Sequence, residues 1–238
     1  MENTDQEIKR QLNRWAATPR IGLIDGKSGA ALAGFLLAEQ TGLSVYKEYA
    51  EKRLSEVCQS LAEADSLDFR NGLAGIGWMM EWVEQEGFSI PPALDMLYEA
   101  DDFIYQVATM SPVTLTLDGS IGYLLYICKR LLNRRPLLYP YRRLALQECA
   151  LFLVRKMGEK MDTIRDLKEG VRFQRAVKDF YRTSIQDTIA LSLLQQIEKS
   201  SPGWEDVPGT RPVSKGENWL GWLLKHRTEG ENYGCLFD

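Results

Sequence analysis

The sequence has very little histidine or cysteine. Its 238 residues include one histidine, His226, and four cysteines, and no two of the cysteines lie within four residues of each other. Zinc sites need three or four converging ligands, and many are built from paired Cys-x-x-Cys motifs. These residue types therefore exclude a three-His or Cys2His2 zinc site, and Ser-His-Asp catalysis would depend on His226 alone. We expect no metal site, no cofactor and no catalytic residue.

Long apolar runs and an excess of basic charge are also missing. No stretch reaches the roughly 18 apolar residues of a membrane-spanning helix, and the first seven residues do not resemble a secretory signal. Lys and Arg total 29 and Asp and Glu total 33, which gives a net charge of −4. A nucleic-acid binder usually carries a basic surface. We expect a cytoplasmic protein with neither a nucleic-acid nor a membrane partner.

The alternation of apolar and polar residues that is typical of strands is scarce. Along most of the chain, the apolar residues instead recur at the spacing of a helix. Leu54, Val57, Cys58 and Leu61, for example, follow the i, i+3, i+4, i+7 pattern of an amphipathic helix. The sequence therefore predicts an all-α fold.

An internal repeat is the most informative feature of the sequence. Residues 25–37, 71–83 and 118–128 each begin with Asp or Asn, then Gly, two further residues and a second Gly, followed by an apolar run. The first glycines, Gly26 and its two counterparts, are 46 and 47 residues apart. This period is typical of a repeat made of two helices.

The repeat predicts a specific local geometry. We expect the leading Asp or Asn to cap the helix, and the first glycine to make a tight turn with positive φ. The second glycine would let another part of the backbone approach closely. The apolar runs predict buried inner helices, and amphipathic segments near 43–62, 92–109 and 139–158 predict outer helices. Alternating inner and outer helices build a partial or small α/α toroid.

The C-terminal part of the chain fits the repeat less well. Residues 184–195 have the apolar run without the glycines, so we interpret them as a degenerate fourth repeat, preceded by an extra loop near 166–170. A Pro- and Gly-rich loop and a short helix are expected over 200–238. We interpret residues 1–238 as a single helical-repeat domain.

These motifs resemble those of the lanthionine synthetase C-like family, whose repeats place a glycine motif at the start of each inner helix. The closest copy is Asn71-Gly72-Leu73-Ala74-Gly75-Ile76-Gly77, and the resemblance extends over about residues 20–200. It implies an α/α toroid. In the family's enzymes, it further implies a zinc ion that activates a substrate thiolate to close thioether rings on peptides.

This sequence departs from that family in two ways. The family's zinc ligands lie in a Trp-Cys-x-Gly segment and in a Cys-His pair followed by Gly, and neither motif is present. The family's toroid has seven helix pairs, whereas this chain is long enough for about five repeats. We therefore assign no zinc ligand and expect no zinc-dependent cyclase activity.

Two functional hypotheses follow. In the first, the chain is a non-catalytic relative that binds a peptide or protein, in modified-peptide biosynthesis, through residues at the starts of the inner helices: Asp25, Arg70, Asn71 and Asp118. The same acidic and amide side chains could instead be simple helix caps. In the second, the chain is a carbohydrate-processing enzyme in which Asp25 and Asp118 form a carboxylate pair. An open helical arc would also expose its inner face, which favours a homodimer.

Overall fold

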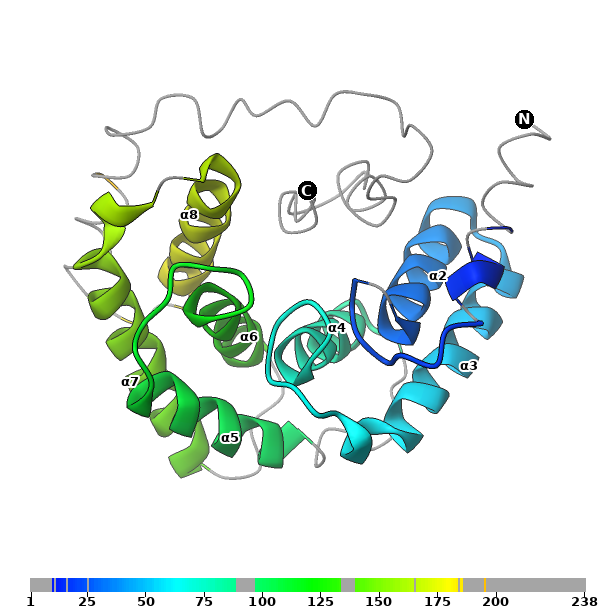
Figure 1. Cartoon of the computed structure of the whole chain (residues 1–238). Helices are drawn as coiled ribbons and strands as arrows, with labels where there is room; N and C mark the ends of the chain where they lie inside the picture. Colours follow the sequence, from blue (N-terminus) through cyan, green and yellow to red (C-terminus); the bar gives the residue numbers. More distant parts are fainter. Residues whose placement is uncertain are drawn as a thin grey trace.

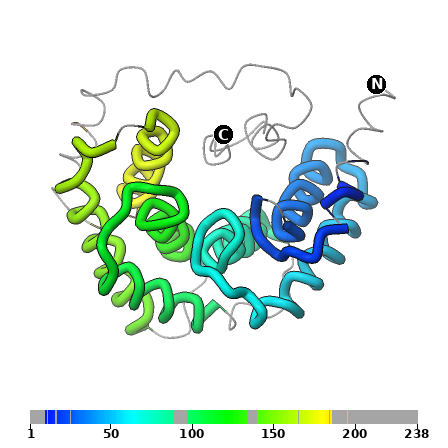
Figure 2. Tube along the Cα trace, viewed as in Figure 1, coloured from blue at the N-terminus to red at the C-terminus, as the bar shows by residue number. Residues whose placement is uncertain are grey.

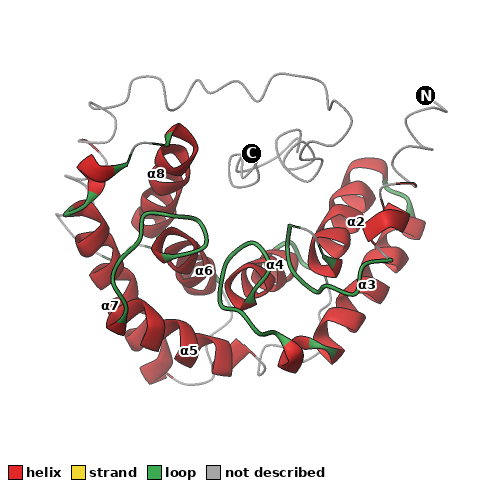
Figure 3. Cartoon of the chain, in the orientation of Figure 1, coloured by secondary structure: helices red, strands yellow, loops and turns green. Residues whose placement is uncertain are grey.

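The computed structural model describes residues 10, 12–15, 17–24, 26–88, 97–133, 140–164 and 166–183, together with Ile185 and Gln195. Every regular element in these ranges is helical, and none of the residues described lies in a strand (Figure 3). The predicted all-α fold is confirmed.

The helices form two concentric layers along an arc (Figure 1). The inner helices are α2 (Lys27–Thr41), α4 (Leu73–Gln85), α6 (Ser120–Leu132) and α8 (Leu167–Arg182). The outer helices are α3 (Ser44–Gln59), α5 (Leu97–Met110) and α7 (Pro140–Gly158). Short 3-10 turns, η1 (Leu61–Glu63) and η2 (Met161–Thr163), follow α3 and α7. The trace in Figure 2 alternates between the inner and outer layers.

The two layers differ in burial as their sequences predict. Every residue of α4 from Ala74 to Glu84 is buried, because this apolar run contacts neighbours on all sides. In outer helix α3, by contrast, the buried residues form one stripe: Tyr46, Ala50, Leu54 and Val57. Successive inner helices pack on each other, α2 on α4 and α4 on α6, so the core runs along the arc between the layers.

The first glycine of each repeat is the N-cap of its helix, and its conformation corrects our expectation. The φ angles of Gly26, Gly72 and Gly119 are −139°, −107° and −137°, so none of these glycines needs positive φ. Glycine is required by close approach instead. A Cβ on Gly26 would lie 2.5 Å from Gly22 O, and a Cβ on Gly72 would lie 2.6 Å from Asp68 N.

The second glycine of each repeat allows the preceding loop to fold back over the first turn of the helix. A Cβ on Gly29, Gly75 or Gly122 would collide with a backbone carbonyl oxygen of that loop. The three carbonyl groups belong to Leu23, Phe69 and Leu117. Each repeat therefore uses its second glycine for the same contact.

A fourth inner helix continues the series where we expected an extra loop. Asp166, 47 residues after Gly119, is the N-cap of α8, and its carboxylate accepts a hydrogen bond of 2.8 Å from Lys168 N. Residues 166–170 therefore begin a helix, and the expectation of a loop was wrong. The predicted degenerate repeat at 184–195 falls outside the described residues except for Ile185 and Gln195, and all of 200–238 also falls outside them.

Candidate functional site

The loops that precede the inner helices lie side by side on one face of the arc, at the N-terminal ends of these helices, and we call this face the inner-helix mouth. Figure 3 shows them in green over the near ends of α2, α4 and α6. Leu23 N and Ile24 N each donate a 2.8 Å hydrogen bond to Arg70 O, which joins the first loop to the second. Leu117 N donates a 3.1 Å hydrogen bond to Glu169 Oε2, which joins the third loop to α8.

Arg70 and Asp118 connect the second loop to the third. The Arg70 backbone N–H donates to Asp118 Oδ1 at 3.2 Å, and the Arg70 Nε lies 3.0 Å from Asp118 Oδ2. Their side chains are 38% and 44% exposed. The pair therefore presents a cation and an anion next to each other, both accessible from solvent.

Asp68 and Tyr123 border this pair. Asp68 Oδ1 accepts a hydrogen bond of 2.6 Å from Asn71 N, which holds the turn before α4. Tyr123, on the first turn of α6, is half-buried, and this burial raises the pKa of its phenol, with further contributions from the negative charges of Asp68 and Asp118. At neutral pH the Tyr123 hydroxyl is therefore a neutral hydrogen-bond donor beside two carboxylates.

The structure brings together three of the four residues predicted for the site. Arg70 and Asp118 are paired, and Asn71 is exposed on the same loop as Arg70 and packs on Gly22. Asp25 falls outside the described residues. The carboxylate pair of Asp25 and Asp118 is therefore not described, and it remains an untested prediction.

The interpretation of Asn71 and Asp118 as helix caps is wrong. The caps of α4 and α6 are Gly72 and Gly119, which have no side chain to accept a bond from the helix. Because glycine occupies the cap position, the side chain before it is free to point along the mouth. Asp118 uses this freedom to reach Arg70 in the neighbouring repeat.

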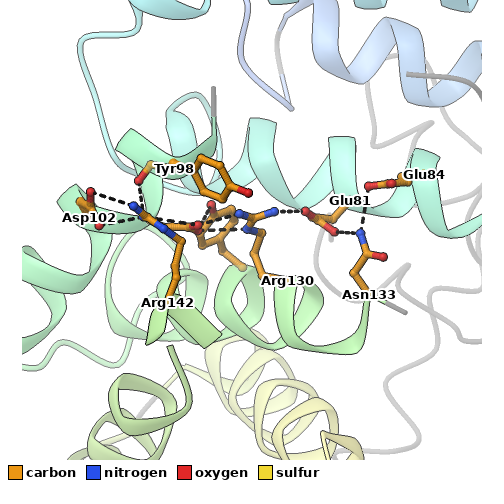
Figure 4. Close-up of polar contacts among 9 residues, drawn as sticks. Glu81, Glu84, Tyr98, Asp102, Arg130, Asn133 and Arg142 are labelled. Atoms are coloured by element: carbon orange, nitrogen blue, oxygen red, sulfur yellow. Dashed lines mark hydrogen bonds and ion pairs between the residues drawn. The ribbon is translucent and has the colours of Figure 1, made fainter. Parts of the chain in front are cut away.

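A buried charge cluster, which we did not predict, joins the two layers (Figure 4). Arg130 of α6 lies at its centre, and its Nη2 is 2.6 Å from Asp101 Oδ2 of α5. It also forms an ion pair with Glu81 of α4, and all three side chains are at most 2% exposed. The Tyr126 hydroxyl donates to Asp101 Oδ1 at 2.6 Å. The sequence signal was a charged residue inside the apolar runs of α4 and α6, Glu81 and Arg130.

The cluster extends outwards in both directions. Asn133 Nδ2 donates to Glu81 Oε2 at 2.6 Å and to Glu84 Oε2 at 2.9 Å. On the other side, Arg142 of α7 lies 2.8 Å from Asp102 Oδ1 and donates to the carbonyl oxygen of Tyr98 at 2.7 Å. Four helices are thus joined by one network of ion pairs and hydrogen bonds.

The burial of this cluster sets its protonation. Burial raises the pKa of Glu81, while Arg130 and Asn133 lower it in part. Burial alone would lower the pKa of Arg130, but Tyr126, Asp101 and Glu81 outweigh it and raise the pKa. Because the guanidinium stays charged and has carboxylates on two sides, the cluster is a structural cross-link within the core.

The described residues do not fit a zinc centre. They contain no group of three or more His, Cys, Asp or Glu side chains placed to hold a metal ion. Burial raises the pKa of the Cys128 thiol, and it raises that of Cys149 to about 12, so neither is readily a thiolate ligand. His226 and Cys235 are outside the described ranges, so the predicted absence of a zinc site stays a prediction.

Within the part of the chain that the structure describes, no helix has the length and apolar character to cross a membrane. The expected cytoplasmic location is not tested by this finding.

Comparison with known protein families gives a match over part of the chain. Residues 3–111, which include α2 to α5, match the family model described as "Lanthionine synthetase C-like protein". No curated protein and no solved structure matches the chain. The matched residues contain two of the glycine motifs that carried the resemblance, at Gly26 and Gly72. Residues 3–111 are therefore similar in sequence to the lanthionine synthetase C-like family.

Proposed function

We propose that this lanthionine synthetase C-like chain is a non-catalytic protein that binds a peptide or protein partner at the inner-helix mouth. A role in the biosynthesis of modified peptides is part of this proposal, because the similarity to the family provides that context. The observation that carries it is the exposed Arg70–Asp118 pair, which spans two repeats at the mouth.

The chemistry of the mouth suits an extended peptide. A guanidinium can bind backbone carbonyl oxygens and carboxylates, and a carboxylate can accept from backbone N–H groups and cationic side chains. Arg70 and Asp118 present both functions next to each other, and Asn71 adds an amide on the same loop. Charge-assisted hydrogen bonds contribute about 1.5–3 kcal/mol each, so losing one should weaken binding about tenfold or more.

A displayed peptide library tests this proposal. Wild-type protein is used to select peptides of about 12 residues from a random library, and the recovered peptides are then titrated by calorimetry. We expect Arg70→Ala and Asp118→Ala each to weaken binding about tenfold or more. The control is Glu48→Ala, which removes an exposed carboxylate from outer helix α3.

Two outcomes would contradict the proposal. One is that no peptide is selected above background. The other is that the recovered peptides bind both mouth variants as tightly as they bind wild type. Circular dichroism of each variant establishes that a loss of binding is not a loss of fold.

We further propose that the chain forms a homodimer and that it has neither a nucleic-acid nor a membrane partner. Size-exclusion chromatography with light scattering tests the dimer directly.

A further inference from the structure

A second surface lies at the other end of the inner helices, where α2 and α4 terminate. We call it the helix-end groove. It encloses about 330 Å³ and is lined by the end of α2, the turn into α3 and the residues that follow α4. This volume falls at the low end of the range typical of ligand pockets, roughly 300–1,000 Å³.

Two large apolar side chains, Phe88 and Leu43, line the helix-end groove. Phe88 lines it and stacks on the buried Phe35, with ring centroids 4.5 Å apart, so its position is fixed by the core. Leu43 also lines the groove and is 52% exposed. A large aliphatic side chain held half in solvent beside a fixed aromatic ring is suited to contact an apolar side chain of a partner.

The charge around the groove is mainly negative. Glu39 and Glu86 line it, and Lys47 is the lysine of the lining. Lys47 lies 3.9 Å from Glu51, so part of its charge is offset on its own helix. Lys129, which is buried, interacts electrostatically with Glu86 and so offsets part of its charge. The C-terminal ends of α2 and α4 add the negative ends of two helix dipoles, and the N-terminus of α3, at Ser44, adds the positive end of one.

We infer that the helix-end groove is a docking site for a partner segment that combines an aliphatic side chain with adjacent Lys or Arg residues. The aliphatic group contacts Leu43 and Phe88, and the cations lie against Glu39 and Glu86. The site is separate from the inner-helix mouth, because it lies at the opposite ends of the same helices. The inference therefore does not depend on peptide binding at the mouth.

Fluorescence anisotropy with defined peptides tests this inference. The probe is a fluorescein-labelled peptide, Gly-Ser-Lys-Leu-Arg-Leu-Lys-Ser, and its counterpart has Glu in place of each Lys and Arg. We expect saturable binding of the basic peptide at concentrations below about 1 mM, and at least about tenfold weaker binding of the acidic one.

Variants locate the site. Leu43→Asp should weaken binding of the basic peptide at least about tenfold. The double variant Glu39→Lys/Glu86→Lys should reverse the preference and favour the acidic peptide. The matched control is Val45→Asp, because Val45 is 60% exposed on α3 but does not line the groove. Asp118→Ala, at the mouth, should also leave this binding unchanged.

The inference is overturned if the basic peptide shows no saturable binding, or if Leu43→Asp and Val45→Asp weaken it equally. It is also overturned if the double variant keeps the preference for the basic peptide. Thermal melts of all four variants confirm that each one folds. If the wild-type protein binds no peptide at the inner-helix mouth but still binds the basic peptide in the helix-end groove, the proposed function alone is rejected.

Discussion

Arg70 and Asp118 are separated by 48 positions in sequence, yet the Arg70 Nε lies 3.0 Å from Asp118 Oδ2. They belong to the loops of consecutive repeats, each within two residues of the first glycine of its motif. Their contact places one charge of each sign on neighbouring loops, which is why we treat the mouth as a binding surface.

If that pair serves binding, its loss should affect stability little. Asp118→Ala is expected to change the free energy of unfolding by less than about 1 kcal/mol, because exposed ion pairs contribute little. Urea unfolding followed by circular dichroism measures this. A cost of several kcal/mol would mean that Asp118 is mainly structural.

The second glycine of each repeat should not tolerate even a methyl group. Gly75→Ala would place its Cβ against the carbonyl oxygen of Phe69, which is backbone and cannot move aside cheaply. We expect a loss of about 3 kcal/mol in the free energy of unfolding. Gly42→Ala is the comparison, because Gly42 has φ +68° and open space around it.

Gly42→Ala should cost about 1 kcal/mol through backbone strain alone. Urea unfolding of the two variants side by side measures the difference. Equal losses would show that the loop over α4 adjusts and that the glycine contact is not required.

The stability of the folded protein should depend strongly on Arg130, the cation at the centre of the buried charge cluster. Arg130→Met leaves Glu81 and Asp101 buried without that charge, and we expect a loss of about 3–5 kcal/mol. The triple variant Glu81→Gln/Asp101→Asn/Arg130→Met should recover part of this loss, because the uncompensated charges are gone. Chemical unfolding checks both values.

The control for Arg130 is Lys156→Met, which removes an exposed ion pair with Glu159. This change should stay within about 0.5 kcal/mol. If Arg130→Met were as mild as the control, the cluster would not be a cross-link of the core.

Lys129 should make stability depend on alkaline pH. Burial lowers its pKa from 10.5 to about 8, although Asp179 and Glu86 oppose the shift. The folded state therefore releases this proton at lower pH than the unfolded state, so stability rises as pH increases from about 8 to 10.5. Relative to Lys129→Met, wild type should gain about 2 kcal/mol between pH 7 and 9.5.

Urea unfolding of both proteins at the two pH values tests this, since the tyrosine and cysteine contributions cancel in the difference. A difference that does not change with pH would mean that Lys129 keeps an ordinary pKa in the folded protein.

Sequence patterns located the inner and outer helices because the glycine contact recurs at a constant period. Glycines at 26, 72 and 119 precede α2, α4 and α6 by one residue. The glycine motif did not predict helix α8, because Glu169 occupies the position of the second glycine. The Glu169 side chain accepts a hydrogen bond from Leu117 N.

The sequence alone does not predict which residues Asp118 and Arg130 contact. Asp118 is joined to Arg70 by the way two loops stack, which a local pattern does not encode. Arg130 is a charge inside an apolar run, but its partners Glu81 and Asp101 come from two other helices. Only the packing of those helices identifies the partners.

Photo-crosslinking from the mouth tests the central claim most directly. Tyr123 is replaced by p-benzoylphenylalanine, and the protein is irradiated with a peptide selected on wild type. The control carries the same group at Tyr105, which is exposed on outer helix α5. We predict a covalent peptide adduct from position 123 and none from position 105. Adducts from position 105 alone, or from neither position, would contradict binding at the inner-helix mouth.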